Sequence, residues 1–157
     1  MMFWNVFKNS LLLPKKTAIF KLNRVGLDIA VFYNFILYFI ISIPTLMNEL
    51  RDSEMNVLFK LIYFFIFYYL PFTIIVFISL SIIAFLISIL TKIFKRKLAY
   101  SLIWKISSFT TTIPLLLYLF VSIFYQIPSS LFVLAILYSI IILIRMIFIY
   151  PKRKTKQ

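Results

Sequence analysis

The sequence predicts an all-α fold, a polytopic membrane protein built as a four-span helical bundle. The chain of 157 residues is 64% hydrophobic and only 13% charged, a composition typical of multi-span membrane proteins. Its segment Leu61–Thr91 holds 31 residues without a charged side chain. About 20 apolar residues are enough for one helix to cross a bilayer. The positive charges recur in alternate segments along the chain, which is the third observation that predicts this fold.

Residues 1–24 are predicted to form a basic amphipathic helix that lies on the inner membrane surface. Phe3, Phe7 and Leu11 recur at helical spacing, and five positive charges accompany them without an acid. Pro14 is expected to divide this helix into two short pieces. A disordered basic tail is the alternative interpretation, and the regular spacing of the aromatic side chains favours the helix.

The transmembrane domain is predicted to occupy residues 25–150. Its four spans are expected at about 25–47, 71–91, 106–125 and 131–150. The second apolar run is too long for one span and too short for two, since a helix of 31 residues measures about 46 Å against a hydrocarbon core of about 30 Å. Residues 57–70 are therefore expected either to lie in the outer interface or to extend the second span as one long helix kinked at Pro71.

The charges outside the spans predict the orientation of the chain. From the N-terminus to the C-terminus, the successive segments carry net charges of +5, −1, +5, 0 and +4. Lys and Arg mark cytoplasmic segments, so both termini are predicted to be cytoplasmic and residues 151–157 to form a basic cytoplasmic tail. The basic segments also favour anionic lipid. Because topology explains every basic block, no nucleic-acid partner is expected.

Polar side chains inside the first and third spans fall at helical spacing and form one stripe on each helix. These stripes either face each other as interhelical packing contacts or line a polar pathway, and packing is the favoured interpretation. The stripe residues are Asn34, Tyr38, Ser42 and Thr45 in the first span and Ser107, Thr111, Tyr118 and Ser122 in the third.

Two ionisable residues are expected near the cytoplasmic ends of their spans, namely Asp28 and Arg145. At similar depth they would be able to form an intramembrane ion pair, and such charges are functional-site candidates. The simpler interpretation is that Asp28 caps a helix N-terminus while Arg145 extends to the headgroups. The simpler interpretation is favoured here.

The residue types of the chain exclude most enzyme chemistry. The sequence has no cysteine and no histidine, and its only acids are Asp28, Glu49, Asp52 and Glu54. Thiol chemistry, Ser–His catalysis and most metal sites therefore lack their usual residues. We expect a protein that is not an enzyme and that uses no metal or cofactor.

Several N-terminal residues and one segment of the third span follow the sequence pattern of a known family. They are Phe7, Ser10, Pro14, Lys15, Phe20, Lys21 and Gly26, together with Trp104–Pro114. These features resemble a bacterial membrane family of unknown function, mostly from low-GC Gram-positive bacteria. One branch of that family is labelled maltodextrin-utilisation protein, and the family is distantly similar to Yip-type multi-span membrane proteins. The first outer loop, residues 48–60, is shorter than in relatives, and the resemblance implies no activity, catalytic residue or cofactor.

The favoured function is that of a non-enzymatic accessory, regulatory or assembly component of the bacterial cell membrane. Its expected partners are the lipid bilayer and either other membrane proteins or a second copy of itself. A link to maltodextrin utilisation rests on the resemblance alone. The alternative is a small oligomeric transporter or pore, for which the polar stripes are the evidence.

Overall fold

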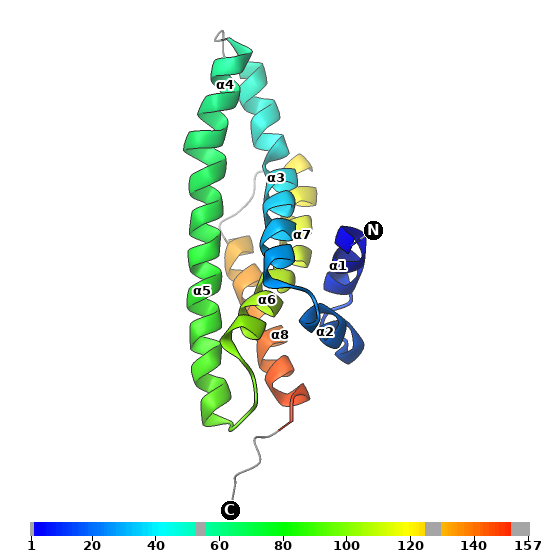
Figure 1. Ribbon diagram of the computed structural model, residues 1–157. Helices are drawn as coiled ribbons and strands as arrows, with labels where there is room; N and C mark the ends of the chain where they lie inside the picture. Colours follow the sequence, from blue (N-terminus) through cyan, green and yellow to red (C-terminus); the bar gives the residue numbers. More distant parts are fainter. Residues whose placement is uncertain (1, 53–55, 125–129, 152–157) are drawn as a thin grey trace, which may run out of the picture.

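The computed structural model describes residues 2–52, 56–124 and 130–151, and within them the secondary structure is helical without a strand. The predicted basic tail after Pro151 lies outside these residues, as do Glu54 and the turn at 125–129. Figure 1 shows the course of the chain. The elements are α1 (Met2–Leu11), α2 (Lys16–Asn23), α3 (Leu27–Asp52), α4 (Val57–Tyr63), the π-helical segment η1 (Phe64–Tyr69), α5 (Leu70–Ile93), α6 (Tyr100–Thr110), α7 (Thr112–Phe124) and α8 (Ser130–Ile149).

Three helices are long and apolar enough to cross a membrane, which agrees with the predicted all-α membrane protein. They are Leu27–Arg51, Val57–Ile93 and Tyr100–Ser122. A fourth apolar helix, Val133–Ile149, is shorter. The third helix begins well before the predicted start of its span, so residues 100–105, expected in a loop, are helical.

The second long helix runs without a break from Val57 to Ile93 over 37 residues. The side chain of Asn56 caps it by accepting a hydrogen bond from the main-chain nitrogen of Leu58 at 3.0 Å. A proline ring inside a helix collides with the carbonyl four residues earlier. Here the wider π-helical turns of η1 come directly before Pro71, and they make room for its ring. Residues 57–70 therefore continue the same helix as the predicted second span.

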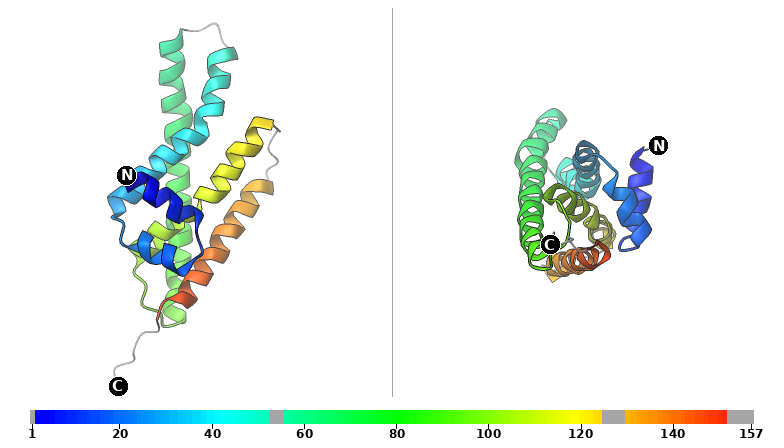
Figure 2. Two further views of the ribbon diagram at one scale, coloured as in Figure 1. Left: turned by 90° about the vertical axis from the view of Figure 1, so that its right-hand side faces the viewer. Right: turned by 60° about the horizontal axis from the view of Figure 1, so that its bottom comes forward.

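The third long helix bends between α6 and α7. Pro114 has no main-chain N–H to donate to Thr110, and its ring displaces that carbonyl from the helical position. Thr111 accordingly forms a turn between the two segments. Below the bend α6 packs against α5, whereas above it α7 packs against α3. Figure 2 shows how α7 and α8 lean away from the long pair of helices formed by α3, α4 and α5.

The core of the bundle surrounds α6. Ile103, Ile106 and Phe109 of this helix are completely buried, and α3 and α8 contribute most of the side chains around them. The ring of Phe109 meets the ring of Tyr33 edge-on, with centroids 5.6 Å apart. The hydroxyls of Tyr33 and Thr112 share a hydrogen bond of 2.9 Å, which joins α3 to the start of α7.

The N-terminal helices α1 and α2 pack against the bundle. The ring of Phe3 lies 5.1 Å from that of Tyr33, and the ring of Phe20 lies 5.5 Å from that of Tyr150. The opposite side of α1 exposes Trp4, with the ammonium group of Lys8 over its ring at 5.2 Å from the centroid. Both helices therefore have one side on the protein and another that carries exposed basic and aromatic groups.

Candidate functional site: a cavity between α3, α5, α7 and α8

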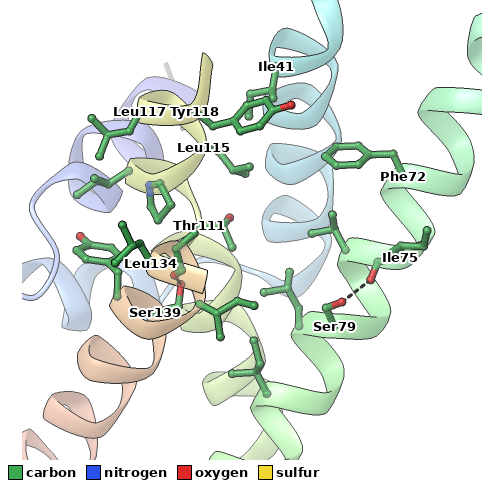
Figure 3. Close-up of a pocket in the computed structure, with 18 of the residues that line it drawn as sticks. Ile41, Phe72, Ile75, Ser79, Thr111, Leu115, Leu117, Tyr118, Leu134 and Ser139 are labelled. Carbon is green, nitrogen blue, oxygen red and sulfur yellow. Dashed lines mark hydrogen bonds between the residues drawn. The ribbon is translucent and has the colours of Figure 1, made fainter. Parts of the chain in front are cut away.

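The bend at Thr111 opens a cavity between the helices. Because α6 packs against both α3 and α5 whereas α7 packs against α3, α5 and α7 diverge above the bend. The space between them has a volume of about 700 Å³. Figure 3 shows Leu115 and Tyr118 of α7 on one side of it and Phe72 and Ile75 of α5 on the other. None of the residues that line the cavity carries a charge.

Three residues of the predicted polar stripes meet at this cavity, namely Ser42, Thr111 and Tyr118. The Ser42 hydroxyl donates to the carbonyl oxygen of Phe39 at 2.8 Å, and the Thr111 hydroxyl donates to that of Ser108 at 2.7 Å. Their donors are therefore used within their own helices. At these two positions the cavity wall presents hydroxyl oxygens and hydrocarbon in place of free donors.

Two other stripe residues, Asn34 and Ser107, are buried in the bundle core instead. The amide of Asn34 donates to the carbonyl oxygen of Ala30 at 2.7 Å, and the Ser107 hydroxyl donates to that of Ile103 at 2.8 Å. Each bond closes within one helix. These side chains fill space where α3 meets α6, and neither lines the cavity.

The remaining stripe residues have separate surroundings. Tyr38 is fully buried, and its ring packs edge-on against the ring of Phe77 with centroids 5.8 Å apart. Thr45 donates a hydrogen bond of 3.2 Å to the hydroxyl of Tyr68, which connects α3 to η1. Ser122 donates to a carbonyl of its own helix at 2.7 Å. The two stripes thus form several separate contacts along the bundle.

The predicted partners Asp28 and Arg145 do not pair. Both side chains are exposed, and no ion pair joins them within the part of the chain that the structure describes. The Asp28 carboxylate instead folds back against Gly26, at the position that a β-carbon on Gly26 would occupy. A glycine therefore leaves room for this carboxylate beside the N-terminus of α3, where negative charge is favourable.

Sequence reasoning missed the role of Lys105, which lies one residue before the predicted third span. In the structure Lys105 is part-buried on α6. Its ammonium group donates to the carbonyl oxygens of Asn23 at 2.9 Å and Val25 at 2.7 Å. Asn23 is the last residue of α2 and Val25 follows it by two residues, so the ammonium group lies at the C-terminal end of this helix, where a cation is stabilising. Lys105 therefore joins the N-terminal segment to the bundle.

Two further cations form similar contacts near helix ends. Lys60 is buried and donates to the carbonyl oxygen of Leu50 in the last turn of α3 at 2.9 Å. Arg96 donates to the carbonyl oxygen of Tyr150 and lies over the ring of Phe148. A chain with few charges thus uses several of them to connect segments.

The residues of the N-terminal resemblance lie within α1 and α2 and at the junctions that follow these two helices. Pro14 follows a cis peptide bond between the first two helices, and Gly26 directly precedes α3. Lys15 and Lys21 are exposed, while Phe20 contacts Tyr150 at the end of α8. These positions favour a role of the resemblance residues in packing the N-terminal segment against the bundle. Within the described residues, no three acidic, histidine or cysteine side chains come together as metal ligands.

A comparison with protein-family models identifies the family of this chain. Residues 48–147 match a family described as Protein of unknown function (DUF1189), and the match covers more than half of the chain. The chain belongs to this family. The DUF1189 match includes Trp104–Pro114 and every cavity-lining residue except Ile41 and Ser42. It does not extend to the N-terminal residues that carry the resemblance. No curated protein and no solved structure matches the chain.

Proposed function

We propose that this DUF1189 protein is a non-enzymatic accessory, regulatory or assembly component of the bacterial cell membrane that acts by binding other membrane proteins. Its spans are four, with α8 as the fourth, because the 20 residues of Ser130–Ile149 match the length that a bilayer needs. Both termini are cytoplasmic. The link to maltodextrin utilisation and the similarity to Yip-type proteins rest on resemblance.

The observation that carries this proposal is the length of the helix from Val57 to Ile93. Its 37 residues measure about 55 Å at 1.5 Å per residue. To fit inside a hydrocarbon core of about 30 Å it would need a tilt of about 57°, outside the observed range of 0–40°. At a common tilt of about 20° it spans about 52 Å, more than the 40–45 Å of a bilayer with its headgroups.

The N-terminal end of this helix is the part that extends beyond the bilayer. The other end carries Lys92 and reaches the basic loop that is proposed to be cytoplasmic. Figures 1 and 2 show the paired ends of α3 and α4 reaching beyond the ends of α7 and α8. We name α4 and the facing last turn of α3 the outer tip.

The outer tip is apolar where water would surround it. Leu58 is 69% exposed and Phe59 is 56% exposed, and Val57 and Ile62 are exposed beside them. Burying apolar surface stabilises at about 25 cal/mol per Å², so a cluster of this kind outside the hydrocarbon core favours association with another protein. A partner that covers the outer tip would remove this surface from water.

The basic segments are proposed to contact anionic lipid at the inner surface. Lys8, Lys15 and Lys21 of the N-terminal segment are exposed, as are Lys92 in the last turn of α5 and Lys95 after it. Each Lys near an anionic surface contributes about 1 kcal/mol of attraction. Trp4 is exposed on the same segment and suits the headgroup level. This arrangement supports the orientation with α1 and α2 at the cytoplasmic face.

The alternative function, a small oligomeric transporter or pore, has weaker support. A polar pathway would need hydroxyl donors that are available to a solute. Ser42, Thr111 and Ser122 each donate to a carbonyl of their own helix. Such bonding is typical of Ser and Thr that pack between helices. It favours a packing role for the stripes.

The accessory function is tested by cross-linking a tagged chain in its native membrane and identifying the recovered proteins by mass spectrometry. Wild type is expected to recover one membrane system repeatedly. The variant Leu58→Ala with Phe59→Ala should lose most of that recovery. The matched control Ile78→Ala with Phe85→Ala, equally exposed on α5, should retain it. Recovery of the chain alone, or equal recovery by both variants, would contradict the proposal.

The orientation is tested separately with single cysteines, which is convenient because the chain has no cysteine of its own. Asn48→Cys lies at the outer end of α3 and Lys95→Cys lies after α5, and both positions are exposed. A membrane-impermeant maleimide should label Asn48→Cys in intact cells and Lys95→Cys only after permeabilisation. The reverse pattern would overturn the proposed orientation.

A further inference from the structure

We propose that the cavity between α3, α5, α7 and α8 binds a single hydrocarbon chain of a membrane lipid, either an acyl or a prenyl chain, with its polar end at Tyr68. The cavity lies among the helices that form the apolar part of the bundle, so lipid chains surround it. This inference concerns a different part of the molecule from the outer tip, and it stands independently of the partner proposed for that surface.

The chemistry of the walls selects an uncharged, apolar ligand. Most of the lining is Ile, Leu, Val, Phe and Pro, and none of it is charged. Ser79 donates to the carbonyl oxygen of Ile75 at 2.8 Å, and Ser139 donates to that of Ala135 at 3.0 Å. Their donors are used, as are those of the other serine and the threonine in the wall. A hydrated ion or sugar would find few groups to replace its bound water.

The size of the cavity favours a hydrocarbon chain over an α-helix as its occupant. A helix with its side chains is about 10–12 Å across, so a volume of about 700 Å³ holds less than two turns of one. A transmembrane helix of a partner therefore does not fit. The same volume lies within the range of about 300–1,000 Å³ that is typical of small-molecule sites. A single flexible hydrocarbon chain matches both limits.

Tyr68 supplies the polar end of the site. Its hydroxyl accepts a hydrogen bond from Thr45 at 3.2 Å, and the residue lines the cavity. An accepting hydroxyl keeps its own proton, so Tyr68 can donate to an ester or phosphate oxygen. Tyr68 lies in η1, toward the outer end of the bundle, while Ser139 and Ile83 line the wall on α8 and α5. A bound chain would therefore extend from Tyr68 into the bundle.

The test is photolabelling of the full chain in vesicles of phosphatidylethanolamine and phosphatidylglycerol. One arm contains phosphatidylglycerol with a diazirine on its acyl chain, and the other contains a polyprenyl phosphate with a diazirine. Mass spectrometry then maps the labelled residues. We expect labelling around Leu115 and Ser139 to exceed labelling of the outward residues Ile78 and Ile82 several-fold. The arm with the higher yield identifies the kind of chain.

Two variants fill the cavity and two matched variants add the same ring outside it. Ser79→Phe and Ala135→Phe place a ring in the lined space, whereas Ile78→Phe and Leu137→Phe place it on the exposed face of the same helices. The filled variants should lose most of the internal labelling, and the outside variants should keep it. Equal labelling in all four, with wild-type helix content and elution, would overturn the proposal.

A conservative variant keeps the test informative where a filled variant does not fold. Tyr68→Phe preserves the ring and removes only the hydroxyl, so the bundle should remain intact. We expect the amount of lipid that co-purifies with the chain in mild detergent to fall several-fold. Thr45→Val also removes a hydroxyl but leaves Tyr68 in place, so it serves as the control. If Tyr68→Phe retains as much lipid as Thr45→Val does, the polar end is assigned wrongly.

Discussion

The helix from Tyr100 to Ser122 packs differently in its two halves. In the lower half, the indole nitrogen of Trp104 donates to the hydroxyl of Ser81 on α5 at 3.1 Å. The ring of Trp104 also stacks on that of Phe77 with centroids 5.8 Å apart. In the upper half, Leu117 is 58% exposed and α5 lies across the cavity.

Polar content does not explain this difference, because both halves contain hydroxyl residues that bond to their own helix. Ser107 in the lower half and Ser122 in the upper half both do so. What changes between the halves is the direction of the helix at Thr111, three residues before Pro114. One proline, Pro114, therefore decides where the bundle is closely packed and where it can admit a ligand.

The largest effect is expected in the core of the lower half. Phe109→Ala removes a completely buried ring, and the free energy of unfolding should fall by about 3 kcal/mol. This loss is at the lower end of the range for replacing a buried aromatic residue by alanine, because the unfolded chain in a membrane stays in an apolar solvent. The matched change Leu117→Ala in the upper half should have little effect. Unfolding by SDS in mixed micelles measures both, and equal losses would remove the distinction between the halves.

A smaller loss is expected when Lys105 is replaced. Lys105→Met keeps the length of the side chain and removes both hydrogen bonds to the C-terminal end of α2, at a cost of about 2 kcal/mol. The control Lys92→Met changes an exposed lysine and should be neutral. The same unfolding assay measures the loss, and limited proteolysis should show that residues 1–24 become accessible. Protection equal to wild type would mean that Phe3 and Phe20 suffice to hold the segment.

The bend itself is tested with Pro114→Ala. The alanine restores a donor for the carbonyl of Thr110, which contributes about 1 kcal/mol to the straight helix. We expect α7 to move toward α5 and the cavity to narrow. Spin labels on Ile75→Cys and Leu117→Cys, on opposite sides of the cavity, should report a shorter distance by electron paramagnetic resonance. An unchanged distance would show that packing of α7 against α3 sets the bend without the proline.

The sequence predicted the parts of the molecule that depend on composition and helical period. The long apolar helices follow from hydropathy, and the spacing of Ser42, Thr111 and Tyr118 placed them inside the bundle, where they line one cavity. Contacts between distant segments were not predictable. Lys105 has the same charge as the lysines and the arginine of the loop before it, and only the fold brings it to the carbonyls at the C-terminal end of α2. The separation of Asp28 from Arg145 likewise depends on how the helices rotate.

The smallest effect concerns the hydrogen bond between Trp104 and Ser81. A double-mutant cycle of Trp104→Phe and Ser81→Ala should give a coupling energy of about 0.6 kcal/mol, the average for such bonds between membrane helices. A hydrogen bond beside the upper half of the bundle joins Thr45 to Tyr68 at 3.2 Å, and it is more exposed than the one between Trp104 and Ser81. Its cycle, with Thr45→Val and Tyr68→Phe, should give a value close to zero, because water or lipid headgroups replace an exposed hydrogen bond. A coupling at Thr45 as large as that at Trp104 would mean that the upper half is held as firmly as the lower one, and the cavity would then be rigid when a lipid chain enters.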